Sequence, residues 1–226
     1  MASRRLAAAI GVCLVAVALG PDVLAQVPVH LEPRHPVAFE NNALRVLNVN
    51  IGGGDTTLDH IHENDIAIVC ISGCEIRTMP LGGGWGEWLS RLPGGVSVTA
   101  NAGHPSIHRH QAGGSLYHVI SVENLRQRAW SQDPPATDSA TKLVSETRAF
   151  QIYDVRVATG APAKERVHSQ PVVAVLISGE VTVDAQGGLA KVLKRSGDWT
   201  FIAAGRARRM VDQLATDAHV VEVEVR

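Results

Sequence analysis

The sequence predicts an all-β fold that is built twice. Aromatic residues make up only 4% of the 226-residue chain, whereas glycine occurs 21 times and β-branched residues are plentiful. This mixture favours short strands joined by tight turns. No long amphipathic helical pattern follows the N-terminal segment, and part of the first half recurs in the second half. We therefore expect two similar β-domains in tandem.

The recurring stretch covers residues 43–74, which align without a gap with residues 149–180 at an offset of 106. Eight of the 32 aligned positions are identical, which indicates an internal duplication. The identical pairs are Ala43 and Ala149, Val49 and Val155, Gly54 and Gly160, His62 and His168, Val69 and Val175, Ile71 and Ile177, Ser72 and Ser178, and Gly73 and Gly179. Residues 95–103 also resemble 197–205, and residues 118–123 resemble 219–224.

Two strands are predicted at matching places in each copy. Leu44–Ile51 and Ile66–Ile71 are rich in apolar and β-branched residues, and so are Phe150–Val157 and Val172–Ile177. A loop that contains glycine or proline joins the two strands of each pair. Regular short strands with such turns predict a β-sandwich or β-barrel in each half.

The repeat also suggests where the domains begin and end. We expect an N-terminal domain over residues 37–126, a linker over residues 127–146 and a C-terminal domain over residues 147–226. The linker assignment rests on residues 131–140, which are rich in proline, serine and aspartate and are typical of an exposed crossing loop.

The first 25 residues are typical of a signal peptide. Arg4 and Arg5 precede an apolar run from Leu6 to Leu19, and Ala25 provides a small residue at the expected cleavage site. The alternative is a membrane anchor, but the run is shorter than the roughly 20 residues that span a bilayer. We therefore expect a periplasmic or secreted protein with no membrane span after cleavage.

The composition limits the classes of partner. The 21 basic and 22 acidic residues give a net charge of -1, so there is no electrostatic reason to expect a nucleic acid. A small-molecule ligand or substrate is the expected partner, and a homodimer is compatible with the sequence.

The mature chain keeps two cysteines, Cys70 and Cys74, which flank the turn Ile71-Ser72-Gly73. In an oxidising compartment they can form a disulfide across a hairpin. The alternative is that Cys70 is a small buried apolar residue. Neither interpretation implies a catalytic thiol.

The segment from Gly54 to His62 contains the strongest functional signal. His60 and His62 are two residues apart, so on a β-strand their side chains point to the same face. Two imidazoles on one face can bind one divalent metal ion.

With these residues in place, the chain resembles the cupin superfamily, specifically a two-domain bicupin, over about residues 37–226. The first cupin motif is Gly, five residues, His-x-His, three or four residues, Glu, six residues, Gly. This chain provides Gly54, His60, His62 and Gly73, with Ile66 in the glutamate position. The resemblance implies two double-stranded β-helix (jelly-roll) barrels in tandem.

The second cupin motif is less complete. Gly95 and Gly103 match it, Asn101 stands in the proline position and Ser106 stands in the histidine position. An insertion of two residues would bring His108 into register with the family histidine.

The resemblance implies one divalent transition metal held by His60, His62 and His108. Three neutral imidazoles suit Fe, Zn, Mn, Ni or Cu and leave positions open for water or substrate. We expect His104 and His110 at the rim or the surface. Glu63 and Asp65 are either substitute ligands, a catalytic base, or solvated loop carboxylates, and no catalytic acid or base is identified.

The second half has lost most of this motif. Arg166 stands where the first half has His60, His168 is kept, Val172 fills the glutamate position, and Arg208 or Arg209 lies near the missing histidine. A guanidinium group only donates hydrogen bonds, so these residues do not form a metal site. This half is either structural or binds an anionic small molecule through Arg166 and Arg208, with His168 beside them.

The loop Gly82–Trp88 lies between the two motifs of the first half. It is either a mobile lid whose tryptophans contact a ligand, or an exposed hairpin tip that packs against the other half.

These observations favour a metal-dependent small-molecule enzyme, and among such enzymes a dioxygenase-like oxidoreductase. A metal-dependent lyase or isomerase fits the same ligands. The alternatives from other classes are a non-catalytic protein that binds a small molecule or a metal, and a structural module with two vestigial barrels. Fold alone does not decide between them.

Overall fold

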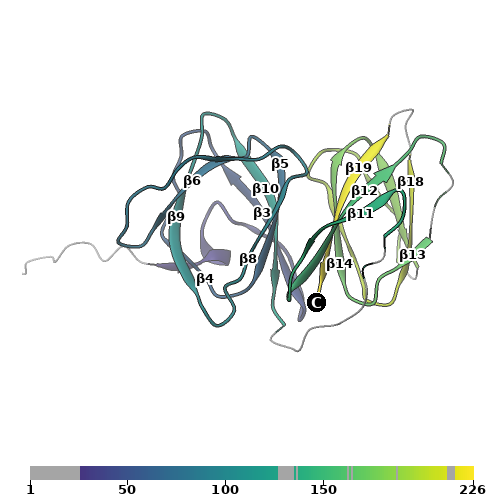
Figure 1. Cartoon of the computed structure of the whole chain (residues 1–226), viewed down its shortest axis with the longest axis horizontal. Coiled ribbons are helices and arrows are strands. Elements are labelled where there is room, and N and C mark those ends of the chain that lie inside the picture. Colours follow the sequence, from purple (N-terminus) through teal and green to yellow (C-terminus); the bar gives the residue numbers. More distant parts are fainter. Residues whose placement is uncertain are drawn as a thin grey trace, which may run out of the picture.

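The computed structural model describes residues 26–126, 135, 137–161, 163, 165–186, 188–212 and 217–226. The predicted signal peptide lies outside these residues. Two β-rich halves lie side by side, and each consists of two facing sheets (Figure 1). No helix in the described ranges has the length and hydrophobicity needed to cross a bilayer.

The N-terminal half has an outer and an inner sheet. In the outer sheet the strand order is β1 (Val27–Pro28), β4 (His60–His62), β9 (Ser106–Ala112), β6 (Glu75–Pro80) and β7 (Leu89–Ser90). In the inner sheet it is β2 (Val37–Glu40), β3 (Leu44–Ile51), β10 (Tyr117–Asn124), β5 (Ile66–Ser72) and β8 (Val96–Thr99). A short 3-10 helix, η1 (Val29–Leu31), follows β1.

The C-terminal half repeats this plan. Its inner sheet has the order β11 (Thr141–Glu146), β12 (Phe150–Val157), β19 (Ala218–Val225), β14 (Val172–Ser178) and β17 (Trp199–Ile202). Its outer sheet has the order β13 (Glu165–Val167), β18 (Ala207–Asp212), β15 (Val181–Ala185) and β16 (Lys191–Leu193). β12 begins 106 residues after β3, and β14 begins 106 residues after β5, as the sequence repeat predicts.

The inner sheets of the two halves pack against each other. One hydrophobic core contains residues of both, including Val69 and Ile120 from the N-terminal half and Phe150 and Val221 from the C-terminal half. Each half also has a core of its own between its two sheets. The central strands are therefore buried on both faces, which explains why they appear in the sequence as apolar runs rather than as alternating patterns.

The structure differs from the sequence prediction at two boundaries. β1 and η1 belong to the N-terminal half although they precede residue 37. The predicted linker contains a strand, β11. Its burial pattern is that of an edge strand, since alternate residues such as Thr141 and Leu143 turn inward while Lys142 stays exposed. β11 then pairs with β12 as an edge strand of the inner sheet.

Cys70 and Cys74 form a disulfide with a Cα–Cα distance of 6.0 Å. The bond connects the end of β5 with the turn that leads into β6, so it links the inner and outer sheets of the N-terminal half. Both cysteines are also buried, so the two interpretations of the sequence, a disulfide and a buried apolar position, are both correct.

Candidate metal centre

Four histidines from two neighbouring strands converge inside the N-terminal half. His60 and His62 come from β4, and His108 and His110 come from β9. Within each strand the two residues are i and i+2, so both side chains face the space between the sheets. The strands pair antiparallel with His60 opposite His108, which brings the two sets together.

One ligand atom from each of these histidines lies within 4.8 Å of the others. Two imidazole nitrogens that each lie about 2.1 Å from a shared ion are at most about 4.2 Å apart. The cluster is therefore close to a coordination geometry, and small side-chain rotations close the difference. No other group of three or more potential ligands occurs in the part of the chain that the structure describes.

The protonation states of the cluster suit a metal. Burial is the largest cause that lowers the pKa of His60 to about 3, of His62 to about 2 and of His108 to about 4. Burial and repulsion from the other imidazoles also hold the pKa of His110 well below its usual value. The rings are thus neutral at physiological pH, which is the form that binds a metal.

Several ring nitrogens of the cluster have no hydrogen-bond partner among the described residues. These are His60 Nε2, His62 Nδ1 and His108 Nε2, and all three are buried. His60 Nδ1 lies 2.9 Å from the carbonyl oxygen of Leu58, which can only accept, so Nδ1 carries the proton and Nε2 presents its lone pair. Such backbone contacts orient the imidazoles of metal sites. A divalent metal ion would satisfy the unpaired nitrogens, so the donor set fits one.

A cavity of about 400 Å³ opens beside the cluster, and His62, His108 and His110 line it. Its apolar wall residues come mainly from the inner sheet and include Val49, Ile66, Ile68, Val98 and Val119, and polar residues such as Ser97, Thr99 and Ser121 also line it. Ile66, which stands in the glutamate position of the cupin motif, is therefore a wall residue. The metal would be bound without a carboxylate from that position.

The sequence reasoning missed His35, which also lines this cavity. Its Nδ1 lies 2.6 Å from a carboxylate oxygen of Glu32, and both side chains are buried. The His35 ring centroid lies 4.7 Å from that of His60. These residues precede the first motif, in a segment placed outside the domain, and no spacing rule links them to it. They form a histidine–carboxylate pair beside the cluster.

An ion pair ties the two ligand strands together. Arg109 Nε donates to Asp59 Oδ1 at 2.8 Å, and a second contact joins the same two side chains. The hydrogen bond to Arg109 is the largest cause that lowers the pKa of Asp59. Asp59 directly precedes His60, and Arg109 lies between His108 and His110, so this pair holds together the two segments that carry the ligands.

The structure corrects one expectation and settles others. His110 was expected at the rim or the surface, but it belongs to the cluster because it lies on the same strand face as His108. His104 is exposed, and so is Glu63. Asp65 accepts hydrogen bonds from the backbone N–H groups of Asn101 and Ala102, so it holds a loop.

The remaining motif residues have structural contacts. Ser106, which holds the strict histidine position, lines the cavity and donates to Asn101 Oδ1 at 2.8 Å. In the Gly82–Trp88 loop, the rings of Trp85 and Trp88 each lie 4.8 Å from the guanidinium group of Arg77. The two rings therefore pack on a residue of their own half.

The candidates of the second half form a buried charged cluster. Glu222 is fully buried and forms ion pairs with Arg208 at 2.5 Å and with His168 at 3.3 Å. Burial opposes ionisation of Glu222, but Arg208 and His168 outweigh it and lower its pKa to about 2. His168 also contacts Glu224 at 2.5 Å, and the two carboxylates outweigh burial and raise the pKa of His168. His168 is thus engaged by acids.

No family model matches the sequence, and no curated protein matches it. Solved structures do share its fold. A cupin 2 conserved barrel domain protein from Leptotrichia buccalis is 8% identical, with a TM-score of 0.54 over 83% of this chain and 86% of its own. Salicylate 1,2-dioxygenase from Pseudaminobacter salicylatoxidans is 10% identical, with a TM-score of 0.60 over 81% and 71%.

The S161A mutant of Bacillus subtilis oxalate decarboxylase is 12% identical, with a TM-score of 0.56 over 81% of this chain and 69% of its own. At these identities the likeness shows the fold alone. The chain therefore has the cupin fold in a two-domain arrangement, as its motifs predicted, and its four-histidine cluster is a site that can hold a metal.

Proposed function

We propose that this protein is a metal-dependent enzyme that acts on a small organic molecule as a dioxygenase-like oxidoreductase. The observation that carries the proposal is the cluster of four neutral imidazoles, three of which line a cavity of about 400 Å³. An all-imidazole donor set suits iron and other transition metals, which supply redox or Lewis-acid chemistry when bound.

The residues of the chain provide what such chemistry needs around the metal. The cavity has the volume of a typical small-ligand site, and its apolar side chains can pack against an organic substrate. His35, oriented by Glu32, is within the cavity wall and can hold or pass a proton. Arg91 also lines the cavity and offers a positive charge to an acidic substrate.

Oxygen consumption tests this proposal. Protein reconstituted with Fe(II) should consume O2 in the presence of a phenolic acid from a panel of such compounds and should release an oxidised product. The His62→Ala variant should show neither. Binding of metal and ligand without any turnover would instead support a non-catalytic binding protein.

A metal-dependent lyase is the second candidate, because the same donor set fits it and a decarboxylase is among the structures that share the fold. The oxalate decarboxylase structure shares the fold as well as the dioxygenase structure does, within a TM-score difference of 0.04. Product formation without O2 consumption in the same assay would support this candidate.

We also propose that the enzyme works outside the cytoplasm, after removal of residues 1–25. The N-terminal sequence pattern supports this, and so does the Cys70–Cys74 disulfide, a bond that persists in oxidising compartments. Intact-mass analysis of protein from its native host should give a chain that begins at or near Gln26. An unprocessed chain in the cytoplasm would contradict export.

A further inference from the structure

The C-terminal half contains a second cavity whose polar groups the proposed metal chemistry does not use. Its volume is about 370 Å³, and Arg166 from β13 and Arg208 from β18 line it. The two arginines stand opposite each other in the antiparallel pair β13–β18, as His60 and His108 do in β4–β9. Two guanidinium groups thus occupy positions that correspond to two of the histidines.

Both arginines point inward and are almost completely buried. The side chain of Arg166 is 11% exposed and that of Arg208 is 4% exposed. Their strand neighbours Glu165 and Arg209 face outward and form an exposed ion pair at 3.5 Å. The guanidinium group of Arg166 is held over the ring of Tyr153 at 4.5 Å, so its orientation is fixed.

The two arginines differ in how well their charges are compensated. Glu222 forms an ion pair with Arg208 at 2.5 Å and also contacts His168 at 3.3 Å, but it lies 3.9 Å from Arg166. Asp138 and Glu165 line the same cavity, and Glu165 is paired with Arg209. The charge of Arg166 is therefore only loosely compensated. A buried charge without a close partner is costly unless an anion compensates it.

The hydrogen-bonding groups also lack partners. Nε and Nη2 of Arg166 and Nε of Arg208 are buried and have no hydrogen-bond partner among the described residues, whereas Nη2 of Arg208 faces Glu222. Nε and Nη2 are the pair of donors that binds the two oxygens of a carboxylate in a bidentate manner. These cationic donors exclude a metal ion from this cavity.

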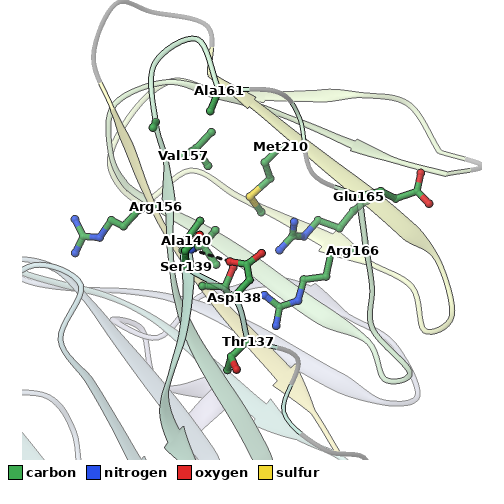
Figure 2. Close-up of a pocket in the computed structure, with 14 residues that line it drawn as sticks. Thr137, Asp138, Ser139, Ala140, Arg156, Val157, Ala161, Glu165, Arg166 and Met210 are labelled. Carbon is green, nitrogen blue, oxygen red and sulfur yellow. Dashed lines mark hydrogen bonds between the residues drawn. The ribbon is translucent and has the colours of Figure 1, made fainter.

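The rest of the cavity wall favours an apolar ligand body. Val155, Val157, Ala158, Ala161 and Met210 line one part of it together with the two arginines, and Thr137, Asp138, Ser139, Thr141 and Glu165 line another part. Figure 2 shows Arg166 and Met210 among these lining residues, while Arg156 points away from them. Arg156 is bound to Asp154 at 2.8 Å and does not compete for an anion.

We propose that this cavity binds one small organic monocarboxylate, with its carboxylate on Arg166 and Arg208 and its apolar body against the aliphatic wall. A single negative charge would pair with the loosely compensated Arg166, whereas a phosphate dianion would bring a second negative charge close to Glu222 and Asp138. The site is independent of the metal centre and of the chemistry proposed there.

Binding of benzoate, measured by isothermal titration calorimetry, tests the proposal, with benzamide and inorganic phosphate as the other probes. We expect one benzoate to bind per chain, whereas neutral benzamide and phosphate should bind far more weakly. The His62→Ala variant separates the two cavities, because it disrupts only the metal site of the N-terminal half. It should therefore bind benzoate as the wild type does, and any benzoate bound at a metal would be lost. Loss of binding in His62→Ala, or preferential binding of phosphate, would overturn the proposal.

Arg166→Gln should raise the dissociation constant by about tenfold or more, the loss expected for a charge-assisted hydrogen bond. Arg209→Gln is the matched control, since it removes an arginine from the outward face of the paired strand β18 and should leave binding unchanged. Arg208→Gln is combined with Glu222→Gln so that no buried carboxylate is left unpaired. If Arg166→Gln fails to fold, Arg166→Lys keeps the charge without the paired donors and should also weaken binding. Unchanged benzoate binding in these variants, or its absence in the wild type, would show that the arginines are structural only.

Discussion

At the scale of single residues, the buried histidines couple stability to pH. The pKa of His60 is lowered to about 3 and that of His62 to about 2, whereas both groups titrate near 6.5 in the unfolded chain. Between pH 6.5 and 4 the unfolded chain therefore binds protons that the folded chain does not, and the free energy of unfolding falls as the pH falls.

We accordingly expect metal-free protein to lose stability between pH 7 and pH 5, by up to about 1.4 kcal/mol per pH unit for each such histidine. Urea denaturation in the presence of a chelator measures this loss. His62→Leu removes one of these groups and should show a smaller loss over the same range. An identical pH dependence in both proteins would contradict the assignment of buried, neutral rings.

The histidines also show what could be predicted from the sequence. His60 and His62 were identified because residues two apart share a face of a strand, and His108 followed from the motif. His110 obeys the same spacing rule with His108, but it was assigned to the rim because a smaller ligand set was expected. Glu32 and His35 could not be predicted, because only the folded chain brings them beside His60.

At the scale of elements, two turns show why the halves fit together. Gly94 and Gly197 have φ angles of +83° and +90°. A Cβ atom at Gly94 would lie 2.5 Å from the ring of His219, and one at Gly197 would lie 2.8 Å from the ring of His118. Each glycine turn thus packs against a histidine of the other half. Hydrogen bonds to Asp154 and Asn48 hold these rings in place.

Gly94→Ala should therefore destabilise the protein in two ways. The left-handed backbone costs about 1–2 kcal/mol with a side chain, and the clash with His219 adds a cost typical of overpacking, about 1–3 kcal/mol. Gly103→Ala is the control, since Gly103 has a φ of +81° but open space around it. Thermal denaturation of both variants should give a larger loss for Gly94→Ala, and equal losses would contradict the close contact between the halves.

The strands themselves were largely predictable, and β3 and β12 coincide with the predicted ranges. Their apolar runs indicate burial on both faces, but the sequence does not say what covers the second face. β11 was missed because its partly polar pattern follows a segment rich in turn-forming residues, and only pairing with β12 makes it a strand.

At the scale of the whole molecule, the shared core should make the two halves unfold together. Phe150 lies fully buried in that core beside residues of β3, β5 and β10. Phe150→Ala should cost about 3–5 kcal/mol and should speed amide hydrogen exchange in the N-terminal half as well as in its own. Leu193→Ala, in the separate core of the C-terminal half, is the comparison variant.

Hydrogen exchange followed by mass spectrometry distinguishes joint unfolding of both halves from unfolding of the C-terminal half alone. Exchange in β5 and β10 should respond more strongly to Phe150→Ala than to Leu193→Ala at equal loss of stability. If the N-terminal half keeps its protection in Phe150→Ala, the halves are independent domains that merely touch.

The arrangement of the whole chain separates two kinds of site. The outer sheet of one half carries imidazoles and the equivalent sheet of the other carries guanidinium groups, so one duplicated fold offers a metal site and an anion site. This division rests on ligand chemistry, since neutral imidazoles donate lone pairs to a metal and guanidinium groups cannot. The central claim is therefore that any bound metal belongs to the N-terminal cluster.

Metal content per chain, measured by inductively coupled plasma mass spectrometry after reconstitution and removal of excess metal, tests this claim most directly. The wild type and His168→Ala should each retain about one equivalent, because His168 is engaged by Glu222 and Glu224. His60→Ala and His62→Ala should retain little, since each removes a buried ligand. Retention of metal by His60→Ala together with its loss from His168→Ala would place the metal in the C-terminal half and contradict the account.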